Sequence, residues 1–195
     1  MTVLNDFDFE KIVGTHTLLY GETNTKKTFY TAKFIEFLLE IKRVPPKDVS
    51  VLDFAPKLAY VNKLKIGGRI QDYYSNSKKC NIIAFKGEII PPRINARNQK
   101  ELFGLLCHNH KKVVKILDIF NANPTEILII NDISIYLHLG SKKYLMDTIS
   151  KTKTFFGNAY YGSSISSKFS KLLSIKEKIR VEFLIKNIEN SFKTN

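Results

Sequence analysis

The chain has few cysteines and no long apolar run. Its two cysteines, Cys80 and Cys107, are too few for a disulfide scaffold or a four-thiolate zinc site, and neither belongs to a CxxC pair. No apolar stretch approaches the roughly 20 residues that a membrane-spanning helix requires. The opening residues, MTVLNDFDFE, lack the basic-then-apolar order of a secretion signal. We therefore expect buried, reduced thiols and a cytoplasmic protein without a membrane partner.

Acidic residues are scarce compared with basic ones. Lys and Arg number 31 against 18 Asp and Glu, which gives a formal net charge of +13. A surface with this excess attracts polyanions, so nucleic acid is the first candidate partner. A general codon bias toward Lys, Asn and Ile would give the same composition, so the net charge leaves both interpretations open.

The hydrophobic pattern predicts a single α/β domain over residues 1–195. Apolar residues make up 44% of the chain, enough for one substantial core. Short apolar runs at 15–21, 49–52, 81–85, the start of 126–140 and 153–162 alternate with segments of helical period, as in strand-crossover-strand units. We predict a three-layer sandwich with a mostly parallel central sheet. It carries a basic excursion at about 57–80 and a C-terminal amphipathic helix at about 174–192.

The segment after the first predicted strand has the spacing of a phosphate-binding loop. The pattern G-x-x-x-x-G-K-[ST] aligns with Gly21, Glu22, Thr23, Asn24, Thr25, Lys26, Lys27 and Thr28. The segment opens an amphipathic helix, so its N–H groups and the helix dipole would face an anion. Lys27 would reach the β- and γ-phosphates, and Thr28 would hold a magnesium ion.

Lys26 is the one mismatch in this pattern, because it stands where the pattern requires glycine. Its Cβ would lie where phosphate approaches the backbone, so we expect a wider loop or a different turn, and weaker binding. The alternative interpretation is an ordinary strand-turn-helix junction in which Thr25 caps the helix.

A second element is the strand in EILIINDIS, which delivers Asp132 close to its carboxyl end. Open parallel sheets gather ligand groups at that edge. A carboxylate there would bind a water on the magnesium held by Thr28. Alternatively, Asp132 caps the next turn.

The loop Gly21 to Thr28, the strand LIINDIS and the order of the intervening segments resemble the P-loop NTPases, and within them the RecA/KaiC-like ATPases. The resemblance spans about residues 14–165 and implies the P-loop NTPase fold with ATP and Mg²⁺. It implies that Asp53, at the end of the strand after the loop helix, polarises the attacking water, although Glu is usual there. It also implies that Asn158 senses the γ-phosphate. No Glu follows Asp132, so slow turnover is expected.

Other polar residues are open to two interpretations. Arg93 and Arg97 follow the third predicted strand, where they would touch phosphate in the same or a neighbouring subunit of a homo-oligomer. We favour solvated arginines at a helix start. His138 has no visible partner, and Ser174 with Glu177 has the spacing of a capping box for the last helix.

The basic excursion has the composition of a single-strand nucleic-acid surface. Basic groups that track a backbone alternate there with aromatic rings that would stack on bases. These residues are Lys57, Lys63, Lys65, Arg69, Lys78 and Lys79, with Tyr60, Tyr73 and Tyr74 among them. The alternative is a solvated flap over the nucleotide site.

Three functional hypotheses follow. The leading one is an ATP-binding protein that hydrolyses ATP slowly, or only when a partner such as nucleic acid completes the site. The second is a kinase that uses the same loop on a nucleoside or another small acceptor. The third is a non-enzymatic nucleic-acid-binding module whose loop has decayed.

Overall fold

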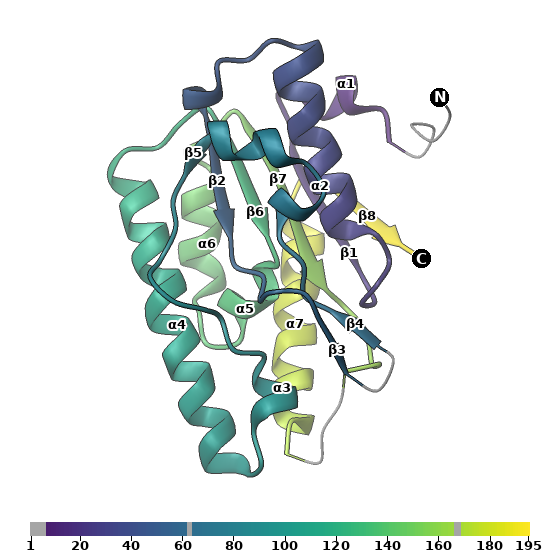
Figure 1. The fold of residues 1–195 in the computed structure, drawn as a ribbon, viewed down its shortest axis with the longest axis vertical. Coiled ribbons are helices and arrows are strands. Elements are labelled where there is room, and N and C mark those ends of the chain that lie inside the picture. The colour runs from purple at the N-terminus through teal and green to yellow at the C-terminus, as the bar shows by residue number, and fades with distance from the viewer. Residues whose placement is uncertain (1–6, 62–63, 166–168) are drawn as a thin grey trace.

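A computed structural model describes residues 7–61, 64–165 and 169–195 (Figure 1). Its central sheet has the strand order β5-β2-β6-β7-β1-β8, and every neighbouring pair is parallel. The strands are β1 (His16–Gly21), β2 (Val49–Asp53), β5 (Asn81–Ile82), β6 (Ile127–Asn131), β7 (Thr154–Tyr160) and β8 (Asn190–Thr194). The predicted α/β class with a parallel central sheet is confirmed.

Helices cover both faces of this sheet, which makes three layers (Figure 1). One face packs against α1 (Phe9–Ile12) and α2 (Lys27–Glu36), which continues as a π-helical turn over Phe37–Ile41. The other packs against α4 (Gln99–Ala122), α5 (Ile133–Leu137), α6 (Lys142–Ile149) and α7 (Lys171–Asn187). Successive strand residues face opposite cores, as Leu18 and Leu19 do. Because both faces are covered, β6 is buried along its whole length.

The carboxyl ends of the strands point toward the lower half of Figure 1, where several short elements gather. They include α3 (Pro92–Asn95) and the antiparallel pair β3 (Ala59–Val61) and β4 (Leu64–Ile66). Short 3₁₀ segments lie at Pro46–Asp48, Ile70–Asp72 and Ser75–Lys79. The basic excursion therefore contains a hairpin beside the sheet edge.

Gly67 and Gly68 do not lie between β3 and β4. They follow β4, and both have positive φ angles, 73° and 120°. A Cβ at Gly67 would lie 2.7 Å from the carbonyl oxygens of Pro56 and Lys57. Glycine is needed here because the chain returns tightly over Pro56.

The C-terminal segment differs most from the prediction. The predicted helix at about 174–192 begins at Lys171 and ends at Asn187, so Glu177 lies in its interior and not in a capping box with Ser174. The next residues form β8, an edge strand parallel to β1. Its sequence, NSFKT, has no apolar alternation because most of its side chains are not buried. No helix in the described ranges is long and apolar enough to cross a bilayer.

Candidate functional site

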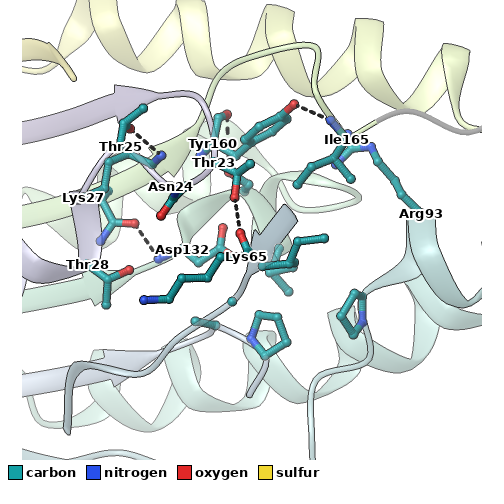
Figure 2. Close-up of a pocket in the computed structure, with 18 of the residues that line it drawn as sticks. Thr23, Asn24, Thr25, Lys27, Thr28, Lys65, Arg93, Asp132, Tyr160 and Ile165 are labelled. Carbon is teal, nitrogen blue, oxygen red and sulfur yellow. Dashed lines mark hydrogen bonds between the residues drawn. The ribbon is translucent and has the colours of Figure 1, made fainter. Parts of the chain in front are cut away.

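A cavity of about 570 Å³ lies at the carboxyl edge of the sheet (Figure 2). It is bounded by the β1–α2 loop, the end of β4, α3, α5 and α7. Most residues predicted for the site line it, namely Thr23, Asn24, Thr25, Lys26, Lys27, Thr28, Asp132 and Asn158. Gly21, Glu22 and Asp53 do not line it. The topology thus brings residues more than 100 positions apart to one cavity, because β7 places Asn158 between β1 and β6.

The β1–α2 loop makes two left-handed turns on non-glycine residues. Asn24 has φ 61°, and Lys26 has φ 60° and ψ 13°. Lys26 therefore adopts a backbone conformation that glycine favours, at a cost of about 1–2 kcal/mol for an L-residue. Its side chain is exposed. Whether the Cβ of Lys26 weakens binding of a phosphate stays a prediction.

Lys27, the first residue of α2, folds its ammonium group back onto the loop. Nζ donates to the carbonyl oxygen of Gly21 at 3.0 Å, to the carbonyl oxygen of Glu22, and to Oγ1 of Thr25 at 3.3 Å. Burial lowers the pKa of Lys27 to about 8, although the charges of Asp132 and Glu22 oppose that shift. Lys27 is thus a cation held at the mouth of the loop, beside a carboxylate.

Backbone N–H groups at the start of α2 are available as donors. Among the described residues, no acceptor pairs with the N–H groups of Lys26, Lys27 and Thr28. The first N–H groups of a helix lack intrahelical partners in any case. Thr25 does not cap the helix, because its hydroxyl donates to the carbonyl oxygen of Glu22 at 2.8 Å. The turn therefore presents unpaired donors next to the cavity.

Other contacts hold the loop from outside. The carboxylate of Glu22 accepts hydrogen bonds from the N–H groups of Ser163 and Ser164 and from the Ser164 hydroxyl. The hydroxyl oxygens of Thr25 and Thr194 are 2.6 Å apart, which joins the loop to β8. Glu22 thus fixes the loop rather than lining the cavity.

A network of amide and hydroxyl groups lies beneath the loop. The Thr28 hydroxyl donates to Oδ1 of Asn131 at 3.2 Å, and Nδ2 of Asn158 donates to the same oxygen at 2.8 Å. Nδ2 of Asn158 also donates to the Thr31 hydroxyl at 2.8 Å. The strand-end partner of Thr28 is therefore Asn131, which we did not predict as a site residue. The sequence did contain a signal for Asn131, because this polar residue ends an apolar strand.

The carboxylate of Asp53 is hydrogen-bonded to other residues of the protein. It accepts hydrogen bonds from Nδ2 of Asn131 at 2.7 Å, the N–H of Ile70 at 2.8 Å and the N–H of Ala55 at 3.2 Å. Burial raises the pKa of Asp53, and these hydrogen bonds partly offset the shift. In this structure Asp53 ties the segment after β4 to the end of β6.

Asp132 follows β6 and has a left-handed backbone, with φ 57° and ψ 61°. Its N–H donates to Oδ1 of Asn158 at 3.1 Å, which holds the turn in place. Burial raises the pKa of the Asp132 carboxyl to about 7, and the charge of Glu177 adds to the shift while Lys27 opposes it. Asp132 is the predicted carboxylate that lines the cavity.

A buried charge cluster lies across the cavity from the loop. The guanidinium of Arg93 and Nε2 of His138 both pair with the carboxylate of Glu177, His138 at 3.1 Å. All three side chains are at least nine-tenths buried and line the cavity. The expectation of a solvated Arg93 was wrong, and His138 does have a partner. Arg97 is exposed.

Glu177 was the residue that sequence reasoning missed in this cluster. It shares a buried stripe of α7 with Leu173 and Val181, four residues away on either side. A carboxylate at a core position of an amphipathic helix needs a partner, and this was the available signal. Its partners are Arg93 of α3 and His138, the residue after α5, which the sequence could not pair with α7.

Several side chains of the basic excursion contact other residues of the protein. Lys57 pairs with Glu88, Nζ of Lys65 lies 3.3 Å from the Tyr73 hydroxyl, and the Tyr74 hydroxyl donates to Glu40. Tyr60 remains 70% exposed, whereas Lys63 lies outside the described residues. Contact with nucleic acid stays a prediction.

Two comparisons address the identity of the chain. No protein-family model matches it, and no curated protein sequence matches it. Its function is therefore inferred from the site.

Proposed function

We propose that the chain binds ATP with Mg²⁺ at the loop Gly21–Thr28 and hydrolyses it slowly, or only when a partner completes the site. The observation that carries this proposal is the set of N–H groups at Lys26, Lys27 and Thr28, which have no acceptor in the part of the chain that the structure describes and which adjoin a cavity and the Lys27 ammonium. Converging backbone donors, a helix N-terminus and a lysine are the features that bind phosphate. On this proposal the chain has the P-loop NTPase fold.

Oxygen ligands suited to Mg²⁺ lie beside the loop. Mg²⁺ prefers oxygen, keeps several waters and takes few protein ligands. The Thr28 hydroxyl and the Asp132 carboxylate supply them, and Thr28 would turn from Oδ1 of Asn131 to the ion. Within the described residues, no three His, Cys, Asp or Glu side chains group as a dedicated metal site. The metal would therefore depend on the nucleotide phosphates, and would neutralise the charge that develops on them.

We assign the role of orienting the attacking water to Asp132 in preference to Asp53. Asp132 lines the cavity, where an attacking water would lie, and Asp53 does not. Asp53 already accepts three protein hydrogen bonds. The partner of Thr28 is the neutral amide Asn131, so the metal receives less negative charge from the strand end than a carboxylate would give. This arrangement supports slow turnover.

Binding of Mg²⁺–ATP to the parent and to Lys27→Ala, measured by calorimetry, tests the proposal. Removing a charge-assisted contact to phosphate should weaken binding by about 10- to 100-fold. Lys33→Ala is the matched control, because Lys33 lies on the same helix, pairs with Glu36 and does not line the cavity. Equal affinities for the parent and Lys27→Ala would remove the proposal. Salt-dependent nucleic-acid binding without ATP affinity would favour the non-enzymatic alternative.

A further inference from the structure

The cavity continues well beyond the proposed phosphate site. Lys27 and Thr28 lie at one end of it, and Arg93 and Ile165 lie across from them (Figure 2). Asp132 stands between the ends, because α5 continues directly from it toward His138. If Lys27 contacts the β- and γ-phosphates, the space past Asp132 lies beyond the terminal phosphate.

The cavity as a whole is too large for a phosphate group and one water molecule alone. A single water occupies about 30 Å³ in the liquid, whereas small-molecule sites span about 300–1,000 Å³. The cavity measures about 570 Å³. Its volume therefore suits a nucleotide phosphate group together with a second organic molecule.

The walls of the far part are mostly apolar. Prolines and isoleucines from three segments of the chain form them, namely Pro91, Pro92, Ile94, Ile135 and Ile165. Apolar walls with a few placed polar groups are typical of organic-ligand sites. A ligand with an apolar ring would bury its faces against these side chains.

The polar end of the far part is the cluster of Arg93, Glu177 and His138. A buried ion pair gives little net stability, so its presence needs another reason. Two buried atoms of the cluster, Nε of Arg93 and Nδ1 of His138, have no hydrogen-bond partner among the described residues. The positive and negative groups already offset each other, so an uncharged polar group fits here better than an anion.

We propose that this part of the cavity binds a small, uncharged organic alcohol with a ring-sized apolar body, which accepts the terminal phosphoryl group of ATP. The inference rests on the proposed function and names its second substrate. The alcohol oxygen forms a bond to the γ-phosphorus as the bond from that phosphorus to the β–γ bridging oxygen breaks. ADP leaves with the bonding electron pair, and the hydroxyl proton passes to an oxygen of the transferred phosphoryl group. The products are ADP and a phosphate monoester.

Isoleucine-methyl NMR provides the test, because Ile94 and Ile135 line the cavity while Ile119 is exposed on α4 outside it. The probes are benzyl alcohol and thymidine, each with a ring and a hydroxyl, and glycerol, which lacks the ring. They are added in the presence of Mg²⁺ and a non-hydrolysable ATP analogue. At least one ring-bearing probe should shift the Ile94 and Ile135 methyls saturably and leave Ile119 unmoved, and glycerol should shift none.

Variants that place a larger side chain in the apolar wall of the cavity test the same inference. Ile135→Phe should weaken probe binding at least tenfold, and Ile94→Phe serves if Ile135→Phe fails to fold. Ile119→Phe should leave probe binding unchanged. With γ-labelled ATP, a bound probe should carry label as its monoester.

Four results would overturn the inference. They are the absence of wall-methyl shifts with both ring-bearing probes, equal shifts in the wall-filled variants, binding by glycerol equal to that of the ring-bearing probes, and label found only in inorganic phosphate with a probe bound. If ATP binds and neither ring-bearing probe binds, the inference of an alcohol acceptor is refuted and the proposed ATP binding stands. If a probe binds and ATP does not, the proposed function is refuted, and so is the role of the alcohol as phosphoryl acceptor.

Discussion

The Asp132 carboxyl gives the protein a pH-dependent stability that Asp132→Asn should remove. Its pKa rises from 3.8 to about 7 in the folded chain, chiefly through burial. Between these values the folded chain keeps a proton that the unfolded chain releases, so stability falls as the pH rises from about 4 to about 7. At about 1.36 kcal/mol per pH unit, the full shift corresponds to about 4 kcal/mol. Because Asp132 is only half-buried by surface area and faces the cavity, we expect about half of that.

Urea unfolding at pH 5 and pH 7.5 measures this effect. The stability of Asp132→Asn relative to the parent should be greater at pH 7.5 than at pH 5 by about 1–2 kcal/mol. Asp147→Asn is the control, because Asp147 is exposed on α6 and should give the same difference at both pH values. Parallel pH profiles for the parent and Asp132→Asn would refute the reasoning that burial holds the proton.

Three further predictions concern stability. Glu177→Gln leaves the buried Arg93 without its countercharge and should cost about 3 kcal/mol, or roughly 6–12 °C in the melting temperature; a loss under about 1 kcal/mol would contradict this. Lys26→Gly relieves the left-handed backbone and should raise the unfolding free energy by about 0.5–1 kcal/mol after the entropic cost of glycine; a decrease would show that Lys26 is unstrained. Gly21→Ala puts a Cβ 2.5 Å from the carbonyl oxygen of Thr194 and should cost about 1–3 kcal/mol, with faster amide exchange in β8; unchanged exchange there would contradict the strand contact.

The four inner strands of the sheet, β2, β6, β7 and β1, could be predicted because they are largely buried and read as apolar runs. β6 shows this, since all of its residues are buried. β8 could not, because an edge strand beside β1 needs few buried side chains and carries no such signal. The local hydrophobic pattern thus indicates the buried strands and gives no signal for β8.

The candidate site, too, could be predicted only in part. The β1–α2 loop could be predicted because its spacing is local. The contacts that surround it join Thr28 to Asn131 over 103 positions and His138 to Glu177 over 39, and no local pattern encodes such pairs. Arg93 was taken for a solvated residue because its partner lies 84 positions away on α7. The sequence therefore predicts which residues can act, and the fold decides which of them meet.

On the proposed function, the N–H groups of the β1–α2 loop hold phosphate. A crystal structure with Mg²⁺ and a non-hydrolysable ATP analogue tests it most directly. Phosphate oxygens should lie at hydrogen-bond distance from the N–H groups of Lys26, Lys27 and Thr28, and the Lys27 ammonium should have turned from the carbonyl oxygens of Gly21 and Glu22 to the phosphates. A nucleotide bound elsewhere, with Lys27 still on those carbonyl oxygens, would contradict it.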